Sequence, residues 1–179
     1  RQYGTDQRYI QPSGAALEQI GLPVCIPYVL PRVHDYLAEQ KVLYICEGEK
    51  KAAAVCEYLD IGAIGIGGCW NWGIKKKLHP WIRELISRYD VEMVRVIPDG
   101  DINRYDICTA YGTLADELRR LGVGVEIIKL PRGEDKIDDL LVEWGVESQG
   151  VFADLPKLYA DQLVVSQITL AEQYGLSTS

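Results

Sequence analysis

The stretch VLYICEGEKKA at residues 42–52 decides the fold. Residues 42–46 form a continuous apolar run of strand length, which is typical of a parallel strand covered on both faces. Glu47 and a glycine follow, and apolar side chains then recur at helical spacing over residues 52–59. This order predicts a buried strand, an acid at its carboxyl end and a helix that covers the sheet.

The alternation of strands and helices continues along the chain. Such alternation is typical of an α/β fold with a parallel sheet and helices on both faces. We therefore predict an α/β domain with about four parallel strands over residues 42–150. Residues 1–41 are expected to form an irregular or helical lead-in, and residues 151–179 a C-terminal extension or a linker to a missing domain, with helix within residues 155–174. The other predicted strands are 63–66, 93–97 and 123–129, and the other predicted helices are 32–40, 80–89, 107–121 and 136–144.

The length and composition favour one ordinary globular domain. Of the 179 residues, 47% are hydrophobic, which is enough for a real core. The longest apolar runs fall far short of the roughly 20 residues that cross a bilayer, so we interpret the chain as cytoplasmic, without a membrane partner. Because it begins at Arg1, we expect it to be a piece of a larger protein. The net charge of −7 argues against gripping nucleic acid mainly through a basic surface.

The cysteines and histidines do not have the spacing of a zinc site. The five cysteines include no C-x-x-C pair and are interpreted as reduced thiols. His34 and His79 lie far apart in the sequence. If a metal binds, carboxylates must hold it, which favours Mg²⁺ or Mn²⁺.

Acidic residues follow the predicted strands at the edge where the working groups of open α/β sheets gather. Like charges brought together are costly unless cations neutralise them or some acids stay protonated. One or two Mg²⁺ ions that bridge these acids are the simplest explanation. The acids are Glu47 after the first strand, Asp99 and Asp101 after residues 93–97, and Asp135, Asp138 and Asp139 after residues 123–129.

Each acidic motif also has a simpler interpretation when it is taken alone. E-G after a strand is commonly a turn, and D-K-I-D-D at residues 135–139 suits the start of a helix. D-G favours a hairpin, but a long helical stripe follows Gly100 instead of a second strand. The occurrence of each motif at a strand end, in order, favours a functional site.

In combination, these motifs resemble the Toprim domain shared by DnaG-type primases, topoisomerases and some nucleases. More narrowly, YICEGEKKAAA, IGIGGCWNW, PDGDINRYDICTAYGTLADELRRLG and KIDDLL are similar to the Toprim-like domain of phage and plasmid replication proteins, often found beside a helicase. The resemblance covers residues 42–144 and implies a catalytic domain with Glu47 as general acid/base. It further implies that Asp99 and Asp101 hold Mg²⁺ or Mn²⁺ and that Asp138 or Asp139 matches the later acid. Many Toprim primases have a glycine soon after D-x-D, where this chain continues with residues 103–105, NRY.

Several basic residues are candidates for contacts with nucleotide or DNA. Lys51 opens the helix after Glu47 and could touch a phosphate, and Arg104 could contact a triphosphate or simply pair with Asp101. A basic run follows two tryptophans, a mixture that suits single-stranded nucleic acid, although the tryptophans could instead pack the loop. The residues of this run are Lys75, Lys76 and Lys77, after Trp70 and Trp72.

The resemblance implies a DNA primase domain that transfers nucleotides with a divalent metal. Its partners would be a single-stranded DNA template, nucleotides and a linked or associated helicase or other replication domain. Two alternatives stay open: a Mg²⁺-dependent nuclease on the same acids, and a non-catalytic Toprim module that binds nucleic acid or a replication partner.

Overall fold

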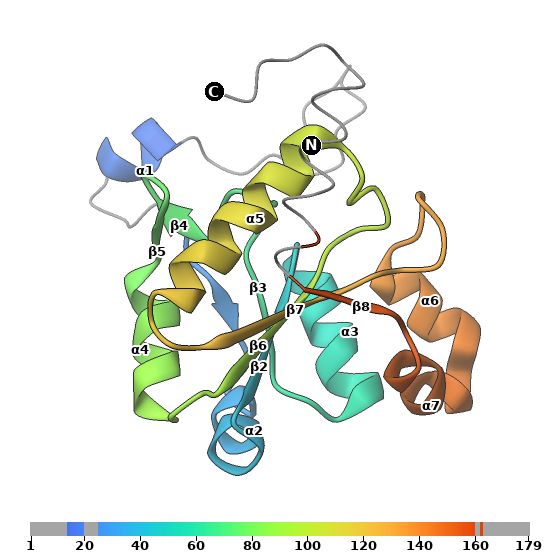
Figure 1. The fold of residues 1–179 in the computed structure, drawn as a ribbon. Coiled ribbons are helices and arrows are strands. Elements are labelled where there is room, and N and C mark those ends of the chain that lie inside the picture. Colours follow the sequence, from blue (N-terminus) through green and yellow to red (C-terminus); the bar gives the residue numbers. More distant parts are fainter. Residues whose placement is uncertain (1–13, 20–24, 160–161, 163–179) are drawn as a thin grey trace.

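A six-stranded, mostly parallel sheet forms the centre of the molecule (Figure 1). The fold is taken from a computed structural model, which describes residues 14–19, 25–159 and 162. The strand order is β1-β3-β2-β6-β7-β8, and the four central strands run parallel. These strands fall where the apolar runs predicted them, which confirms the α/β fold class. They are β2 (Val42–Cys46), β3 (Ala63–Gly65), β6 (Met93–Ile97) and β7 (Gly124–Ile128).

Both edges of the sheet are closed by short antiparallel strands that the sequence did not predict. β1 (Tyr28–Val29) pairs with β3, and β8 (Lys157–Tyr159) pairs with β7. Within residues 155–174, where the sequence predicts some helix, residues 157–159 form a strand because their backbone pairs with β7, and Gln162 is helical. Most of the rest of that range lies outside the described residues. The sheet thus takes strands from both of the segments that flank residues 42–150.

Helices cover both faces of the sheet. α4 and α5 lie on one face, and α3, α6 and α7 pack together on the other, while α2 lies at the bottom of the view in Figure 1. None of the helices in the described part of the chain is long and apolar enough to cross a membrane. The helices are α1 (Gly14–Gln19), α2 (Val33–Gln40), α3 (Glu49–Leu59), α4 (Pro80–Arg88), α5 (Tyr105–Arg119), α6 (Ile137–Trp144) and α7 (Ser148–Ala153), with a 3₁₀ turn at Gly145–Glu147.

The predicted helical stripes form the core. The buried residues of α3 are those that the sequence places on one face, from Ala52 to Leu59. In α5 the buried stripe includes Tyr111 and Leu114, both with no exposed surface. The core therefore fixes α3 against β2 and β3 on one face of the sheet and α5 against β7 on the other, and Glu47 directly follows β2.

The tryptophan-rich loop after β3 contains a small hairpin. β4 (Gly73–Ile74) and β5 (Lys77–Leu78) pair antiparallel, and the two residues between them, Lys75 and Lys76, have φ angles of 50° and 60°. Trp72 is completely buried before the hairpin, as expected of a residue that packs the loop. The hairpin was not predicted, because its turn lacks the Asn-Gly or Asp-Gly pair that favours such a conformation.

Candidate active site

Glu47 lies at the carboxyl end of β2 and is held by a buried tyrosine. The hydroxyl of Tyr111 on α5 donates a hydrogen bond to Glu47 Oε2 over 3.2 Å. Burial raises the pKa of the Glu47 carboxyl, and the negative charge of Asp99 raises it further, whereas Lys51 and the Tyr111 hydroxyl act in the opposite direction. The result is a fixed carboxyl group with increased proton affinity, which are properties that a general acid or base requires.

Asp99 follows β6, the strand that lies beside β2 in the sheet. Cys46 and Ile97 are register partners at the ends of these two parallel strands, so the residues after them emerge at one edge. Lys51 Nζ forms an ion pair with Asp99 Oδ1, and the two side chains are only 15% and 22% exposed. Lys51 therefore neutralises part of the negative charge that gathers near Glu47.

Asp101 and Asp138 each bury one carboxylate oxygen without a partner. Oδ1 of Asp101 and Oδ1 of Asp138 are buried and accept no hydrogen bond from the described residues. Buried polar atoms are nearly always paired in folded proteins, so these two oxygens call for a donor or a cation. Asp139 is exposed to solvent, although the sequence treats it as equivalent to Asp138. Asp138 and Asp139 therefore differ, because only Asp138 buries an oxygen that lacks a partner among the described residues.

Asp138 and Asp99 both act electrostatically on the buried thiol of Cys46, the last residue of β2. Burial is the largest cause of the raised pKa of Cys46; Cys56 and the negative charges of Asp138 and Asp99 raise the pKa further, while Lys51 lowers it. Among the described residues, no group of three or more His, Cys, Asp or Glu side chains is gathered closely enough to hold a metal ion. Mg²⁺ commonly uses one or two carboxylates and completes its shell with water and substrate phosphates. The unpartnered oxygens of Asp101 and Asp138 fit that kind of site.

The loop that carries Asp99 and Asp101 is braced against the loop after β7. The backbone N–H of Gly100 donates to the carbonyl of Asp135 over 2.9 Å. The Asp135 carboxylate in turn accepts hydrogen bonds from Arg132 N and Nε, each 2.8 Å long. A Cβ atom on Gly100 would lie 1.9 Å from the Arg132 carbonyl oxygen. Asp135 follows the same strand as Asp138 and Asp139, but both of its carboxylate oxygens accept hydrogen bonds from Arg132 and stabilise this loop.

A glycine turn after β3 fixes the backbone of Glu47. Gly67 and Gly68 have φ angles of 65° and 131°, which are conformations that favour glycine over residues with a side chain. The N–H of Gly68 donates to the Glu47 carbonyl over 2.7 Å. Asn71 closes the turn by donating from Nδ2 to the Gly67 carbonyl over 2.7 Å. The loop after β3 thus supports the acid from its backbone side.

The basic candidates lie at different distances from these acids. Arg104 is exposed and pairs with Asp101 over 3.3 Å and with Asp106 over 2.9 Å, so it stands beside the site. Lys75, Lys76 and Lys77 are exposed on the hairpin. Lys77 Nζ lies 3.3 Å from Glu117 Oε1, and Glu117 is about 18 Å along α5 from the end of the helix that follows Asp101.

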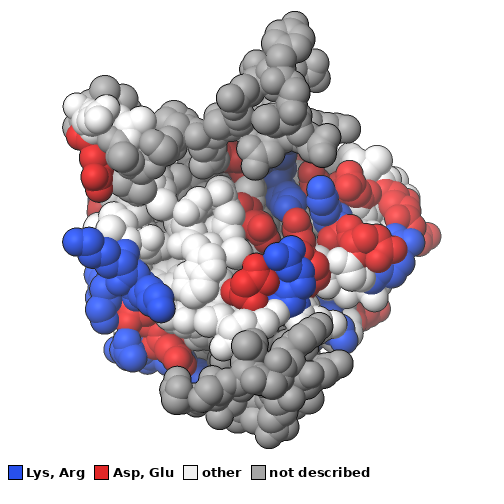
Figure 2. All heavy atoms as spheres, turned by 90° about the horizontal axis from the view of Figure 1, so that it is seen from above, with Lys and Arg blue, Asp and Glu red and all other residues white. Residues whose placement is uncertain are grey.

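Figure 2 shows the face on which the parallel strands end, seen from the top of Figure 1. Acidic and basic side chains are interleaved on one half of this face, uncharged residues cover its middle, and a separate group of Lys and Arg lies on the other side. The acids and the main basic group are therefore separated on one continuous surface.

Tyr111 lies within the predicted helix 107–121, and its contact with Glu47 was not predicted from the sequence. Tyr111 belongs to a helical stripe whose other members are mainly aliphatic, so its periodicity indicates burial alone. Because a buried tyrosine hydroxyl needs a hydrogen-bond partner, a tyrosine in this apolar stripe was the one sign that α5 contacts a polar group.

Comparisons with known proteins agree with this fold. A family model described as "Domain of unknown function (DUF3854)" matches residues 35–148. No curated protein matches the chain. Among solved structures, the chain is similar to the zinc-binding and RNA polymerase domains of the Aquifex aeolicus primase, with 20% sequence identity and a TM-score of 0.52. The match covers 78% of this chain and 32% of the primase chain, so this chain spans about a third of that structure's length. At this identity the likeness shows a shared fold.

Proposed function

The chain belongs to the DUF3854 family, and from that premise we propose that it is a Toprim-like nucleotidyl-transfer domain that synthesises primers on single-stranded DNA with Mg²⁺ or Mn²⁺. One observation carries the proposal: Glu47, with its raised pKa, lies at the same sheet edge as Asp99 and near the buried, unpartnered oxygen of Asp101. The likeness in fold to a primase supports it.

Each acid has a role that its surroundings suit. Glu47 would accept the proton of the attacking hydroxyl, because burial and the charge of Asp99 increase its affinity for a proton. Asp101 and Asp138 would hold the cation through their unpartnered oxygens, with Asp99 beside them. When bound, a divalent cation would lower the pKa of the hydroxyl and stabilise charge on the phosphates. Lys51, if displaced from Asp99, would be free to contact a phosphate.

The hairpin offers a surface for the template strand. Lys76 Nζ lies 5.8 Å from the centre of the Trp70 ring, and Trp70 is 38% exposed. Positive charge beside an aromatic face suits single-stranded nucleic acid of any sequence, because every base can stack. In this proposal residues 42–150 carry the chemistry, and residues 1–41 and 151–179 connect them to a helicase or another domain of a phage or plasmid replication protein.

The proposal is tested by primer synthesis. The full-length protein is expected to join ribonucleotides or deoxyribonucleotides into primers on a circular single-stranded DNA template when Mg²⁺ or Mn²⁺ is present. Asp101→Asn should abolish the products, and Asp139→Asn, which changes an exposed acid on the same edge, should leave them intact. If the protein shortened the template and made no primers, primer synthesis would be contradicted, and the alternative function as a Mg²⁺-dependent nuclease would be supported. If the protein bound the template but neither extended nor cut nucleic acid, the result would support the alternative of a non-catalytic Toprim module.

The cation site is tested separately by calorimetric titration with Mn²⁺. We expect wild-type protein to bind Mn²⁺, and Asp101→Asn and Asp138→Asn to weaken that binding by roughly tenfold or more, because each removes an oxygen that has no protein donor. Asp139→Asn serves as the matched control and should bind as the wild type does. Equal affinity in all four proteins would contradict the assignment of these ligands.

A further inference from the structure

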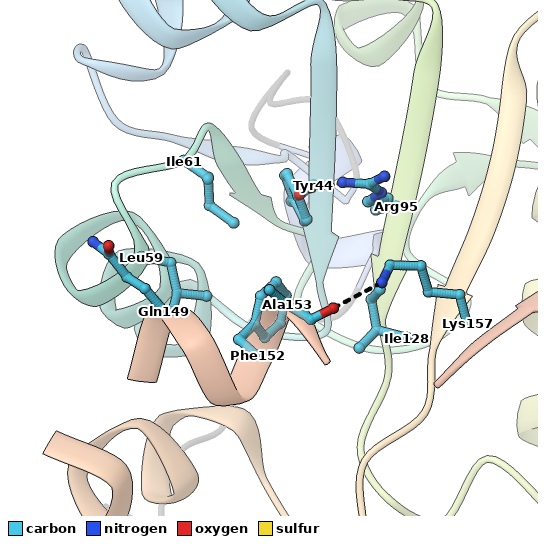
Figure 3. Close-up of a pocket in the computed structure, with 9 residues that line it drawn as sticks. All are labelled: Tyr44, Leu59, Ile61, Arg95, Ile128, Gln149, Phe152, Ala153 and Lys157. Carbon is cyan, nitrogen blue, oxygen red and sulfur yellow. Dashed lines mark hydrogen bonds between the residues drawn. The ribbon is translucent and has the colours of Figure 1, made fainter. Parts of the chain in front are cut away.

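A pocket of about 270 Å³ lies between α7 and the sheet, away from the acidic edge (Figure 3). Tyr44 on β2 and Arg95 on β6 form its inner wall, and Phe152, Ile128 and Lys157 enclose it. Tyr44 precedes Glu47 by three residues, which is about 10 Å along the strand. None of the proposed catalytic or metal-binding residues lines the pocket.

The polar groups of the pocket are mostly hydrogen-bond donors with capacity left over. Arg95 donates from Nε to Glu126 over 2.7 Å and from Nη1 to the Tyr44 hydroxyl over 2.8 Å. These bonds fix the guanidinium plane, while its Nη2 group has no hydrogen-bond partner among the described residues. Lys157 Nζ donates to the carbonyl of Ala153 over 3.0 Å and has further protons to donate (Figure 3). The Tyr44 hydroxyl accepts from Arg95, so its own proton is free to donate.

The remaining lining is apolar and leaves limited space. The rings of Phe152 and Tyr44 are tilted against each other with centroids 6.1 Å apart, and Leu59 and Ile128 extend this surface. A volume of about 270 Å³ equals the space of roughly nine water molecules, which suits a single ring with a short side chain. A ligand for this pocket therefore combines a small apolar body with hydrogen-bond acceptors.

The charges at the pocket indicate which acceptor it suits. Arg95 and Lys157 contribute two positive charges, and Glu126, bound to Arg95, contributes one negative charge. The net charge of these three groups is therefore +1, which a ligand with one negative charge would balance. A phosphate monoester carries nearly two negative charges and would leave an excess. We propose that this pocket binds a small monocarboxylate with an aromatic or branched apolar body. The planar Arg95 fork and the Lys157 ammonium would receive the carboxylate, and Phe152 would pack against the apolar part.

The proposal is tested by following backbone amides in NMR titrations of the chain with phenylacetate, phenylacetamide and phenyl phosphate. Phenylacetate is expected to shift the amides of Tyr44, Ile128 and Phe152 and to bind at least about tenfold more tightly than the uncharged amide. Binding of the amide or the phosphate ester as tight as that of phenylacetate would overturn the proposal. Shifts confined to other parts of the molecule would overturn it as well.

Charge variants of the pocket provide the second arm of the test. Lys157→Gln should weaken phenylacetate binding by about tenfold, whereas Lys129→Gln, which changes an exposed lysine outside the lining, should not alter it. Gln149→Glu adds a negative charge at an exposed position of the rim and should weaken binding without affecting the core. Glu126→Gln should tighten it by freeing Arg95. Unchanged affinity in both Lys157→Gln and Gln149→Glu would overturn the proposal.

Discussion

Glu47→Gln is expected to reduce primer synthesis by about 10²- to 10⁴-fold, which is the usual contribution of a positioned general base. Glutamine keeps the size of the side chain and can still accept the hydrogen bond from Tyr111, but it cannot take a proton. The measurement is the initial rate of primer synthesis at saturating nucleotide. Glu92→Gln, which alters an exposed acid at the opposite end of the sheet, is the control. Wild-type rates in Glu47→Gln would exclude Glu47 as the base.

The same substitution should not weaken the fold at neutral pH. The pKa of Glu47 is raised in the folded protein above the ordinary value of 4.5, so its protonated form is the one that folding favours. That stabilisation is fully present below the unfolded-state pKa and is lost as the pH rises through the folded-state pKa. At pH 7 and without metal, Glu47→Gln should therefore unfold at a temperature equal to or above that of the wild type. A clearly lower midpoint would show that the carboxylate has a structural role.

Gly100→Ala is expected to destabilise the protein by about 1–3 kcal/mol or more and to disrupt the acidic edge. The added methyl would meet the Arg132 carbonyl oxygen at 1.9 Å, and backbone atoms cannot rotate away as a flexible side chain can. The loop would have to shift, which would break the bond from Gly100 to Asp135 and move Asp99 and Asp101. Urea unfolding and primer synthesis should both report the change.

Gly133→Ala is the matched control for this effect. Gly133 lies in the loop that Gly100 touches, and a Cβ atom there meets nothing within 4 Å. It should match the wild type in both measurements. If the two alanine variants had the same free energy of unfolding, the close contact between the two loops would not be a constraint on the fold.

The central sheet could be predicted because its strands are continuous apolar runs between glycine, proline and acidic residues. β2 and β6 begin and end at the residues that the pattern indicated. The short strands could not be predicted in the same way. β8 is three residues long and follows a proline, so it carries too little pattern to distinguish it from the end of a helix. Its pairing is decided by the exposed edge of β7, which is a tertiary contact.

The acids of the site could be predicted from their positions after strands, because parallel strands bring their carboxyl ends to one edge. The different hydrogen-bond environments of these acids could not be predicted. Asp135 and Asp138 are three residues apart, yet the first is bonded to Arg132 and the second has a buried oxygen without a partner. This difference depends on the path of the loop after β7, which the sequence pattern does not specify.

Lys75 and Lys76 form the turn of the hairpin in a backbone conformation that lysine rarely adopts. Both residues adopt left-handed angles that cost roughly 1–2 kcal/mol each for residues other than glycine, and asparagine or glycine would relieve much of this strain. Thermal stability as the sole criterion would therefore replace both lysines. Replacing the pair with Asn-Gly is therefore expected to raise the unfolding temperature of the protein, and the same change would remove two of the positive charges that the hairpin presents to solvent.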